Sequence, residues 1–535
     1  MKPHNPSGPG IAVLVLLSVR FAARTFLASA LALIACSAAH SQLICPVVND
    51  FTNTSPVFNL TNPCVIESGV TFNNLGGSAL LTNFSGASLL VDSGAALDVG
   101  LGAGIINNSM LTNNGRISDA GSILNGPTLA GGTLTNGGTL VTTVDGMLTN
   151  GGTLQGATLN NNLSATITNF GQFRNSENSS LNNSGILTNA GTLTNFLGTI
   201  TNFFGTINNV GSFTNTGGTI TNFIGIITNV ATFNNAGTLN NVNSTLTNLG
   251  SFNNSAALNN SSTLDNAHSF INSGSVTNTG NLENSGFFSS NLLTNSSAGT
   301  VLNDSGATLS NSGTLTNAGT VSNHGTISNS GILNIQPGGV FNNLAGSTFT
   351  QTSGQLIVDG TLNSLTAVQI AGGVLSGTGT INGNVNNSGL VQPGDAPGTL
   401  TLNGNYSQGS FGLLTIDLGG TAPGDSSVLN VSGLSTLDGT LDLTAVNGFI
   451  PAAGDSFTFL LFGALSGDFS QIDFTNWSCP AGDTCTEIVG PHSLRLDVSA
   501  ATSSTPEPSS ILLLATGILA LLPRSRNKIP RGVPR

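Results

Sequence analysis

A short motif, Gly-Thr-Leu-Thr-Asn with close variants, recurs between residues 185 and 335 and strongly limits the folds open to this chain. Its asparagine returns every six or seven residues from Asn189 to Asn284, an interval that is too short for a helical hairpin repeat. Within each motif an apolar residue lies between two threonines, which is the alternation of a very short β-strand. The motif therefore predicts a stack of short strands.

A longer period lies over the short one. Residues 198–217 match residues 218–237 at 13 of 20 positions, so three short motifs form one larger unit. Every third motif has phenylalanine at its apolar position, and the other two keep aliphatic residues there. The phenylalanine column contains Phe173, Phe213, Phe233, Phe252, Phe270 and Phe288, with Leu193 in one gap; the aliphatic columns contain Ile200, Ile220, Leu239, Leu258 and Val276, and Ile207, Ile227, Leu246, Leu264 and Leu282. These columns predict a three-sided parallel β-solenoid with about 18–20 residues per coil, in which each inward side chain stacks on its equivalent one coil later.

The motif asparagine is expected at each corner of the coil. There its side chain would hydrogen-bond the turn backbone and tolerate left-handed dihedral angles. The glycine two positions later is expected for the same conformational reason. The asparagine rows are therefore interpreted first as structural and second as ligand-binding.

The composition favours an all-β chain. Only 6% of residues are charged and 38% are hydrophobic, and strong helix formers are few, so helix is expected only near the two ends. Between residues 42 and 505 there are 3 basic and 22 acidic residues, a net charge of 3 − 22 = −19. A body with this charge repels nucleic acid and anionic lipid, so no nucleic-acid partner is expected.

Residues 1–41 have the layout of a secretory signal peptide. Positive charges precede an apolar stretch at 26–36, and small residues end the segment. Cleavage is expected after Ala39 or Ser41. Two alternatives stay open: a retained membrane anchor, for which the apolar run is short, and lipid attachment at Cys36, which ends a passable lipoprotein box.

Residues 501–535 carry three features in a specific order. A Pro-Glu-Pro motif comes first, an apolar run at 511–522 follows, and a basic cluster comes last; the residues are Pro506, Glu507, Pro508, Arg524, Arg526 and Lys528. This order resembles the PEP-CTERM sorting signal of Gram-negative bacteria, in which the cations stay on the cytoplasmic side. Pro523 and the basic tail to Arg535 depart from the pattern, and a simple C-terminal membrane anchor is the alternative.

The resemblance implies a route for the mature protein. A short C-terminal membrane helix would anchor the chain transiently in the inner membrane. An exosortase-type processing protease would then remove the tag near the Pro-Glu-Pro motif, releasing the body or delivering it to the cell surface. The resemblance also implies an association with exopolysaccharide production.

The two ends of a solenoid need closure, because open strands pair with neighbours. Four cysteines remain after signal removal, and in an oxidising compartment the disulfides Cys45–Cys64 and Cys479–Cys485 are expected. A zinc site is the rival, but no histidine lies near either pair in the sequence. The predicted regions are a signal peptide (1–41), an N-terminal cap (42–70), the β-solenoid repeats (71–392), a C-terminal β-rich capping region (393–500) and the sorting signal (501–535).

From residue 393 the repeat gives way to longer alternating runs. The stretch 397–470 has Pro-Gly-Thr-Leu-Thr at 397–401 and Gly-Phe-Ile-Pro at 448–451. It resembles the C-terminal part of autotransporter-type passenger β-helices. The resemblance implies a segment that caps the helix and assists its folding.

Catalytic chemistry has little support in the sequence. Lyases and hydrolases built on β-helices use clustered acids with a basic residue. Asp265 and Glu283 are 18 residues apart and are expected on one face, about 4.8 Å apart on adjacent strands, without a partner cation. They are interpreted as solvated surface residues. No catalytic residue, metal ligand or cofactor is expected, and the chain is not expected to be an enzyme.

Three functions are therefore considered in order. The first is an exported structural component of the cell surface or biofilm matrix, associated with extracellular polysaccharide. The second is an adhesin whose threonine and asparagine rows bind glycan, another surface or ice. A polysaccharide-degrading β-helix enzyme is the third.

Overall fold

The protein is described by a computed structural model. It covers residues 45, 47, 49–53, 58–75, 79–84, 86–125, 133–136, 139–142, 147–150, 157–394 and 397–500. The predicted signal peptide, Cys36 and the predicted sorting signal lie outside these residues. The described residues form strands and no helix. Among them there is accordingly no helix long and apolar enough to cross a membrane. The chain divides into two compact units, residues 1–350 and 351–535.

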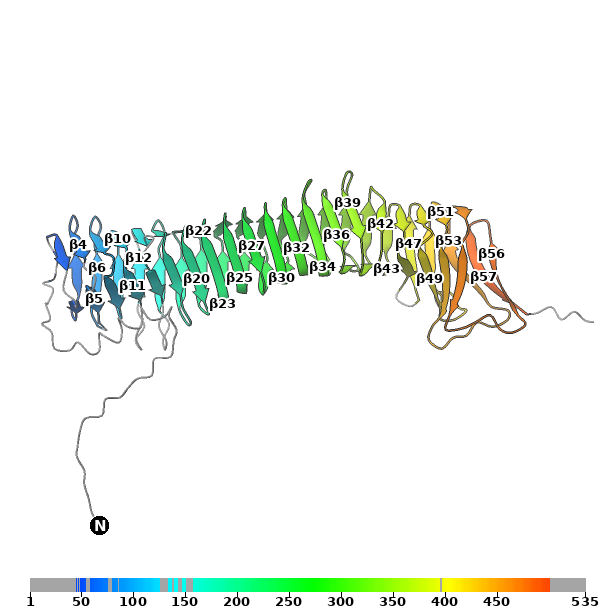
Figure 1. The fold of residues 1–535 in the computed structure, drawn as a ribbon, viewed down its shortest axis with the longest axis horizontal. Helices are drawn as coiled ribbons and strands as arrows, with labels where there is room; N and C mark the ends of the chain where they lie inside the picture. The colour runs from blue at the N-terminus through cyan, green and yellow to red at the C-terminus, as the bar shows by residue number, and fades with distance from the viewer. Residues whose placement is uncertain are drawn as a thin grey trace, which may run out of the picture. The chain divides into compact units, whose positions relative to one another are not determined.

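Unit 1 is a parallel β-solenoid in which each turn adds one short strand to each of three ladders (Figure 1). The first turns run from β1 (Phe51–Asn53) to β14 (Met147–Asn150). Ladder one continues through β17 (Gln172–Asn175), β20 (Thr192–Phe196), β23 (Ser212–Phe223), β25 (Thr232–Val242), β27 (Ser251–Asn254), β30 (Ser269–Asn278), β32 (Phe287–Asn295), β34 (Thr308–Asn317) and β36 (Thr326–Asn329).

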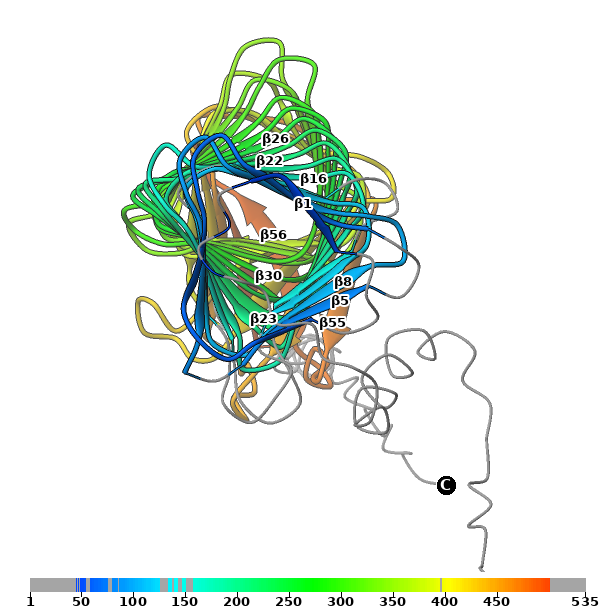
Figure 2. The same cartoon turned by 90° about the vertical axis from the view of Figure 1, so that its left-hand side faces the viewer.

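The other two ladders follow the same order. Ladder two contains β15 (Thr158–Asn161), β18 (Ser180–Asn183), β21 (Thr199–Phe203), β28 (Ala257–Asn260), β37 (Ile332–Ile335) and the second halves of β23, β25, β30, β32 and β34. Ladder three contains β16 (Thr166–Asn169), β19 (Ile186–Asn189), β22 (Thr206–Asn209), β24 (Ile226–Asn229), β26 (Thr245–Asn248), β29 (Thr263–Asn266), β31 (Asn281–Asn284), β33 (Thr300–Asn303), β35 (Thr320–Asn323) and β38 (Val340–Asn343). Ladders one and two form one sheet, because strands such as β23 run through both, and ladder three belongs to a second sheet. Figure 2 shows the β16, β22 and β26 strands on one side of the coil and β23 and β30 on the opposite side.

The predicted stacking of equivalent side chains is confirmed. Phe213 lies beside Phe233 in register, and the column continues to Phe252 and beyond. From Phe213 to Phe288 the ring centroids of successive members are 4.4–4.7 Å apart. Both aliphatic columns also pair as predicted. Each such buried side chain contributes about 1.5–3 kcal/mol before conformational entropy is subtracted.

The predicted coil length holds in the middle of unit 1 and not near its start. Phe233 pairs with Phe252, a separation of 252 − 233 = 19 residues. Phe72 pairs with Leu97, a separation of 97 − 72 = 25 residues. Four residues pair in register in both places, so the additional residues lie outside the paired segments. Extra residues at a bend leave the ladder register intact, and for this reason the solenoid tolerates them.

The prediction for the motif asparagines is confirmed in part: their side chains bond the turn backbone, as Asn195 Nδ2 does to the Gly198 carbonyl at 2.9 Å, but none of these residues has the positive φ of a left-handed conformation. Every one of them from Asn189 to Asn284 is at most 2% exposed. Each lies two residues after a buried apolar residue, so the alternation of the strand turns both side chains inward. In ladder three, from Asn169 to Asn343, each Nδ2 donates to the Oδ1 one turn later at 2.7–2.8 Å. The second N–H of Asn209, for example, donates to the carbonyl of Thr232 at 2.8 Å.

The glycines two positions after the asparagine have a different role from the predicted one. Gly191 and Gly211 are not among the residues with positive φ. A Cβ at Gly211 would instead collide with the carbonyl oxygen of Gly191 in the preceding turn. Glycine avoids this clash because two backbones approach closely there, although the equivalent of Gly211 one turn later is Ala231.

Removing one member of an asparagine row should destabilise the fold. Asn229 accepts from Asn209 at 2.7 Å and donates to Asn248 at 2.8 Å and to the carbonyl of Ser251 at 3.0 Å. The variant Asn229→Ala leaves these buried partners unsatisfied, at a cost of about 1–3 kcal/mol. Urea unfolding followed by circular dichroism measures the loss. Thr228→Ala on the same strand removes a half-exposed side chain and should change stability by less than about 0.5 kcal/mol; equal losses for the two variants would contradict the structural role of the row.

Unit 2 continues with parallel ladders and ends with antiparallel strands. The parallel pairing includes β44 (Thr380–Asn382), β47 (Thr399–Asn403) and β50 (Val428–Val431), and it extends to β52 (Thr440–Ala445) with β55 (Gln471–Thr475). It therefore continues well past residue 393. The antiparallel strand β57 (Ser493–Ser499) then lies between β53 (Ser456–Leu461) and β56 (Thr484–Val489). Pairing on both sides leaves β57 without a free edge.

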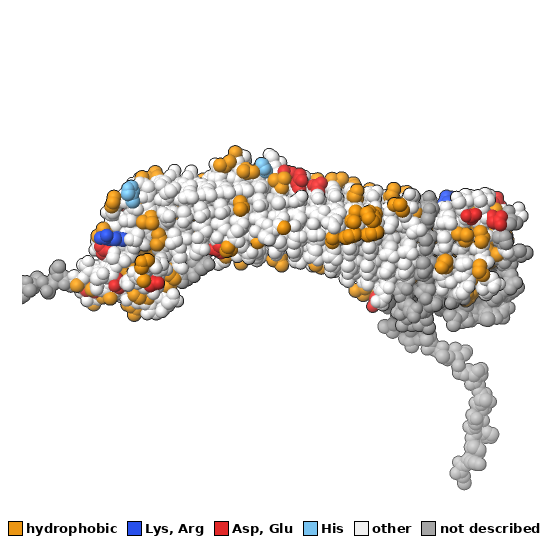
Figure 3. All heavy atoms as spheres, turned by 180° about the vertical axis from the view of Figure 1, so that it is seen from behind, with side chains coloured by type: hydrophobic (Ala, Val, Ile, Leu, Met, Phe, Trp, Pro, Cys, Tyr) orange, Lys and Arg blue, Asp and Glu red, His pale blue; other side chains and the backbone are white. Residues whose placement is uncertain are grey.

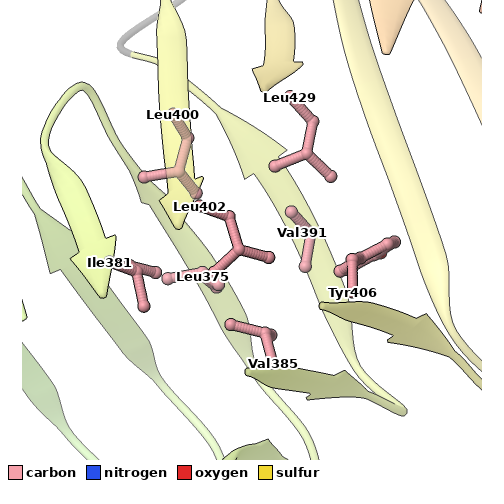
Figure 4. A pocket seen from close by; sticks show the side chains of 8 residues that line it. All are labelled: Leu375, Ile381, Val385, Val391, Leu400, Leu402, Tyr406 and Leu429. Carbon is pink, nitrogen blue, oxygen red and sulfur yellow. The ribbon is translucent and has the colours of Figure 1, made fainter. Parts of the chain in front are cut away.

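The interior of unit 2 is apolar and filled with side chains. Figure 4 shows Leu375, Ile381, Val385, Val391, Leu400, Leu402, Tyr406 and Leu429 around one small hollow. All eight side chains are buried. The Tyr406 hydroxyl donates to Oε1 of Gln408 at 2.6 Å and accepts from Asn387 at 3.1 Å, and burial raises the pKa of this phenol. The hollow is part of the core and has no free polar group for a ligand.

Candidate binding surface

Rows of neutral polar side chains cover the outside of unit 1. In ladder two Thr199 pairs with Thr219 and Thr201 with Thr221. Thr219 in turn pairs with Thr238 one turn later. These residues face outward because they alternate with the buried column. Successive members of a row are therefore separated by the strand spacing, about 4.8 Å.

Outward asparagines also pair between successive turns. Asn182 donates to Asn160 at 2.9 Å, and Asn259 donates to Asn240 at 2.9 Å. In both pairs the donor is on the later turn, the reverse of the inward rows. An amide group has two N–H donors and two acceptor lone pairs, so each side chain keeps hydrogen-bonding capacity for a ligand. Hydroxyl-rich ligands such as glycans match neutral groups of this kind.

The surface around these rows is uncharged. From Asn178 to Leu264 the sequence contains no Asp, Glu, Lys, Arg or His. Figure 3 shows one side of the molecule as mostly neutral polar atoms, with hydrophobic side chains in places and few charged ones. Ionic attraction therefore cannot contribute to binding on this part of unit 1.

The predicted adjacency of Asp265 and Glu283 is confirmed. They pair in register on β29 and β31. Burial raises the pKa of Asp265, and the nearby Asp304 raises it further. Burial and then Asp304, Asp265 and a hydrogen bond with Asp304 raise the pKa of Glu283. Sequence reasoning did not pair Asp304 with them, because it follows β33 at a bend where the regular spacing ends.

Among the described residues, neither ion pair involves this acidic group. Arg174 lies in ladder one, where its guanidinium is 4.9 Å from the centre of the Phe196 ring. Among the residues that the structure covers, no group of three or more His, Cys, Asp or Glu side chains is placed to hold a metal ion. The arrangement thus offers carboxyl groups, and His324 occupies the position of Asp304 one turn later.

The two cysteine pairs form disulfides in the structure. Cys45 is bonded to Cys64 at the start of β3 (Cys64–Ile66), with Cα atoms 5.0 Å apart. Cys479 is bonded to Cys485 in β56, with Cα atoms 5.8 Å apart. The bonds therefore lie near the two ends of the described chain. The predicted sorting residues, from Pro506 to Lys528, are outside that range.

One buried acid was missed by sequence reasoning. Asp119 ends β10 (Arg116–Asp119) in ladder three, at a position that asparagine occupies in later turns, and it is fully buried. Its Oδ1 accepts the Gly121 N–H at 3.0 Å, while Oδ2 has no hydrogen-bond partner among the described atoms. Burial raises the pKa of Asp119 from 3.8 to about 7. The signal was its place in the motif, where Ile-Ser-Asp stands for Leu-Thr-Asn.

Comparisons with known proteins return little. No protein family model matches the chain, and no curated protein matches it. One similar solved structure is a TibC-catalysed hyper-glycosylated fragment of TibA. It is 13% identical, with a TM-score of 0.15, over 79% of this chain and 97% of that chain.

Proposed function

We propose that this chain is an exported structural protein of the cell surface or biofilm matrix, associated with exopolysaccharide. The observation that supports this function most is the interior of unit 1, where stacked columns and asparagine rows repeat turn after turn. A solenoid held this way is a quasi-one-dimensional body in which each turn supports the next. Such a body suits spacing or cross-linking of extracellular polymers. We also propose that each coil has three sides, one for each ladder.

Export and release are part of the same proposal. Residues 1–41 act as the signal peptide, and residues 501–535 act as a PEP-CTERM sorting signal with a short membrane helix. An exosortase-type protease removes this signal, so the anchoring in the inner membrane is transient. The mature body then reaches the cell surface or the medium. The order of residues in these two segments is what supports this route.

The sorting signal is testable in the producing cell. Replacing Pro506, Glu507 and Pro508 together by alanine should keep the protein in the inner-membrane fraction, because the protease loses its recognition motif. Immunoblots of membrane, surface and medium fractions measure this. Thr505→Ser, next to the motif, should be released like the wild type. Release of the triple variant at the wild-type level would contradict the sorting role.

An adhesin is the second candidate, and the outward threonine and asparagine rows favour it. Glycan pulldown and ice-recrystallisation assays on the purified protein test binding directly. If the rows bind, Thr201→Lys with Thr221→Lys should abolish retention, because two long side chains would stand between a ligand and the rows. No retention and no inhibition in the wild type would remove this candidate.

We propose that the chain is not an enzyme. A polysaccharide-degrading enzyme therefore ranks third among the candidates. The pairing of Asp265 with Glu283 is the one arrangement that favours catalysis. A screen over pectin, alginate and other acidic glycans tests it. Chain cleavage by the wild type that Asp265→Asn abolishes would reverse this ordering.

A further inference from the structure

Ladder three of unit 1 exposes large apolar side chains in consecutive turns. They border or belong to the strands β22, β24 and β26, and each is 42–57% exposed: Phe204, Val210, Ile224, Ile226, Val230 and Leu249. We call these six residues the apolar face. Contiguous apolar residues on the outside of a soluble protein mark interaction sites.

The register of the turns makes these side chains into rows. Phe204 precedes β22 and Val210 follows it, and Ile224 and Val230 flank β24 in the same way. The N–H of Val230 donates to the carbonyl of Asn209 at 2.8 Å, as that of Val210 does to Asn189. Successive turns therefore place one apolar row along each border of the face. The outward residues between the rows are neutral, with Thr228 beside Ile226 on β24.

Two members of the apolar face have a costly backbone conformation. Phe204 and Ile224 have φ angles of 59° and 54°, in the left-handed region that bulky and β-branched residues rarely adopt. The equivalent residue one turn later is Asn243, with a φ of 47°, and asparagine tolerates this region. Phe204 and Ile224 are thus unfavourable both in exposure and in conformation. Phe204 contacts the Phe203 ring edge to face, with centroids 4.5 Å apart, and both side chains keep exposed apolar surface that is suited to a contact outside the fold.

The charge pattern identifies the partner. The apolar face lies within the stretch from Asn178 to Leu264, which carries no charged residue. A charged partner would lose hydration on these six residues and meet no opposite charge among them; the nearest outward carboxyl of ladder three is that of Asp265, which pairs with Thr247 of β26. The rest of the body is strongly acidic, so two copies repel each other through most other surfaces. A matching partner is therefore uncharged, apolar and ridged at the strand spacing, and the same face of a second copy has all three properties.

We propose that the apolar face binds the apolar face of a second copy of this chain. A two-fold axis through the contact would bring the rows of one copy into the spaces between the rows of the other. Because only a few turns take part, the interface is smaller than the roughly 800 Å² per partner of a stable complex. The association is accordingly weak and reversible, and it gains importance where the protein is concentrated. This inference goes beyond the proposed scaffold function and does not depend on its export route.

Sedimentation of the full-length protein over a concentration series tests the proposal. The sedimentation coefficient of the wild type should rise with concentration, more steeply in about 0.5 M salt, where screening removes long-range repulsion. The double variant Phe204→Asn with Ile224→Asn should weaken association by about tenfold or more. Its thermal midpoint should be equal or higher, because asparagine relieves the backbone cost. A purely structural role of these side chains predicts a lower midpoint instead.

A matched control distinguishes association through the apolar face from non-specific hydrophobic association. Leu197 is also exposed, at 46%, with a φ of 55°, but it lies at the bend between ladders one and two. Leu197→Asn should leave association unchanged. Val230→Thr keeps the side-chain shape on the face and should weaken association even if the double variant folds poorly. A monomeric wild type at every concentration, or association that survives both face variants, would overturn the proposal.

Discussion

The variant Asp119→Asn is expected to be more stable than the wild type above pH 7, by up to about 4 kcal/mol, and to match it near pH 4. The folded protein raises the pKa of Asp119 from 3.8 to about 7 by burial, partly opposed by the Gly121 N–H. Below about pH 4 the carboxyl is protonated in both folded and unfolded chains, so burial has no ionic cost. As the pH rises from 4 to 7, the unfolded chain loses its proton first. The free energy of unfolding of the wild type therefore falls, by about 1.36 kcal/mol for each unit by which the folded pKa exceeds the unfolded one.

Urea midpoints measured at pH 4.5 and pH 8 check this expectation. Asparagine has no charge to lose, so the difference between variant and wild type should grow across this range and level off above it. Glu67 is exposed, and Glu67→Gln is the control that should show no growing difference. A pH-independent difference for Asp119→Asn would mean that the carboxyl does not titrate in the folded core.

Phe252→Ala is expected to destabilise unit 1 by about 3–5 kcal/mol. The Phe252 ring is fully buried between Phe233 and Phe270, with both centroid distances at 4.7 Å. Alanine leaves a cavity that the neighbouring rings can fill only by moving the turns that carry them. Thermal unfolding followed by circular dichroism measures the loss, and hydrogen exchange should show faster exchange in β25, β27 and β30.

Phe252→Leu gives the matched comparison. The same column already accommodates leucine at Leu193, which lies between Phe173 and Phe213. Leucine should therefore cost less than about 1.5 kcal/mol at position 252. If leucine were as harmful as alanine, the stacking of aromatic rings and not the filled volume would govern this column.

The interior apolar columns could be predicted from the sequence because they are periodic. The spacing of Phe213, Phe233 and Phe252 fixes which residues lie above one another, and the same spacing placed Asp265 beside Glu283. The burial of the asparagines was not predicted, although the signal was present. A residue two positions after an inward apolar residue must also point inward in a strand, and Asn229 does so.

Other features could not be predicted because they depend on the bends between strands. The bends have no period, so the sequence does not show that Phe204 and Ile224 are exposed while Phe213 is buried. The proximity of Asp304 to Glu283 depends on the bend after β33. The reason for Gly211 lies in the carbonyl of Gly191 in the preceding turn, a contact that exists only after the coil has closed.

The two sets of asparagine rows carry opposing dipoles. Inside unit 1 each amide donates toward the C-terminal end, as from Asn209 to Asn229, whereas outside it donates toward the N-terminal end, as from Asn259 to Asn240. Aligned amide dipoles add along a row as they do along a helix. Because the inner and outer rows point in opposite directions, their fields partly cancel. The inner rows run through many turns while Asn182–Asn160 and Asn259–Asn240 are separate pairs, so each added turn still increases the electrical polarity between the two ends of the stack.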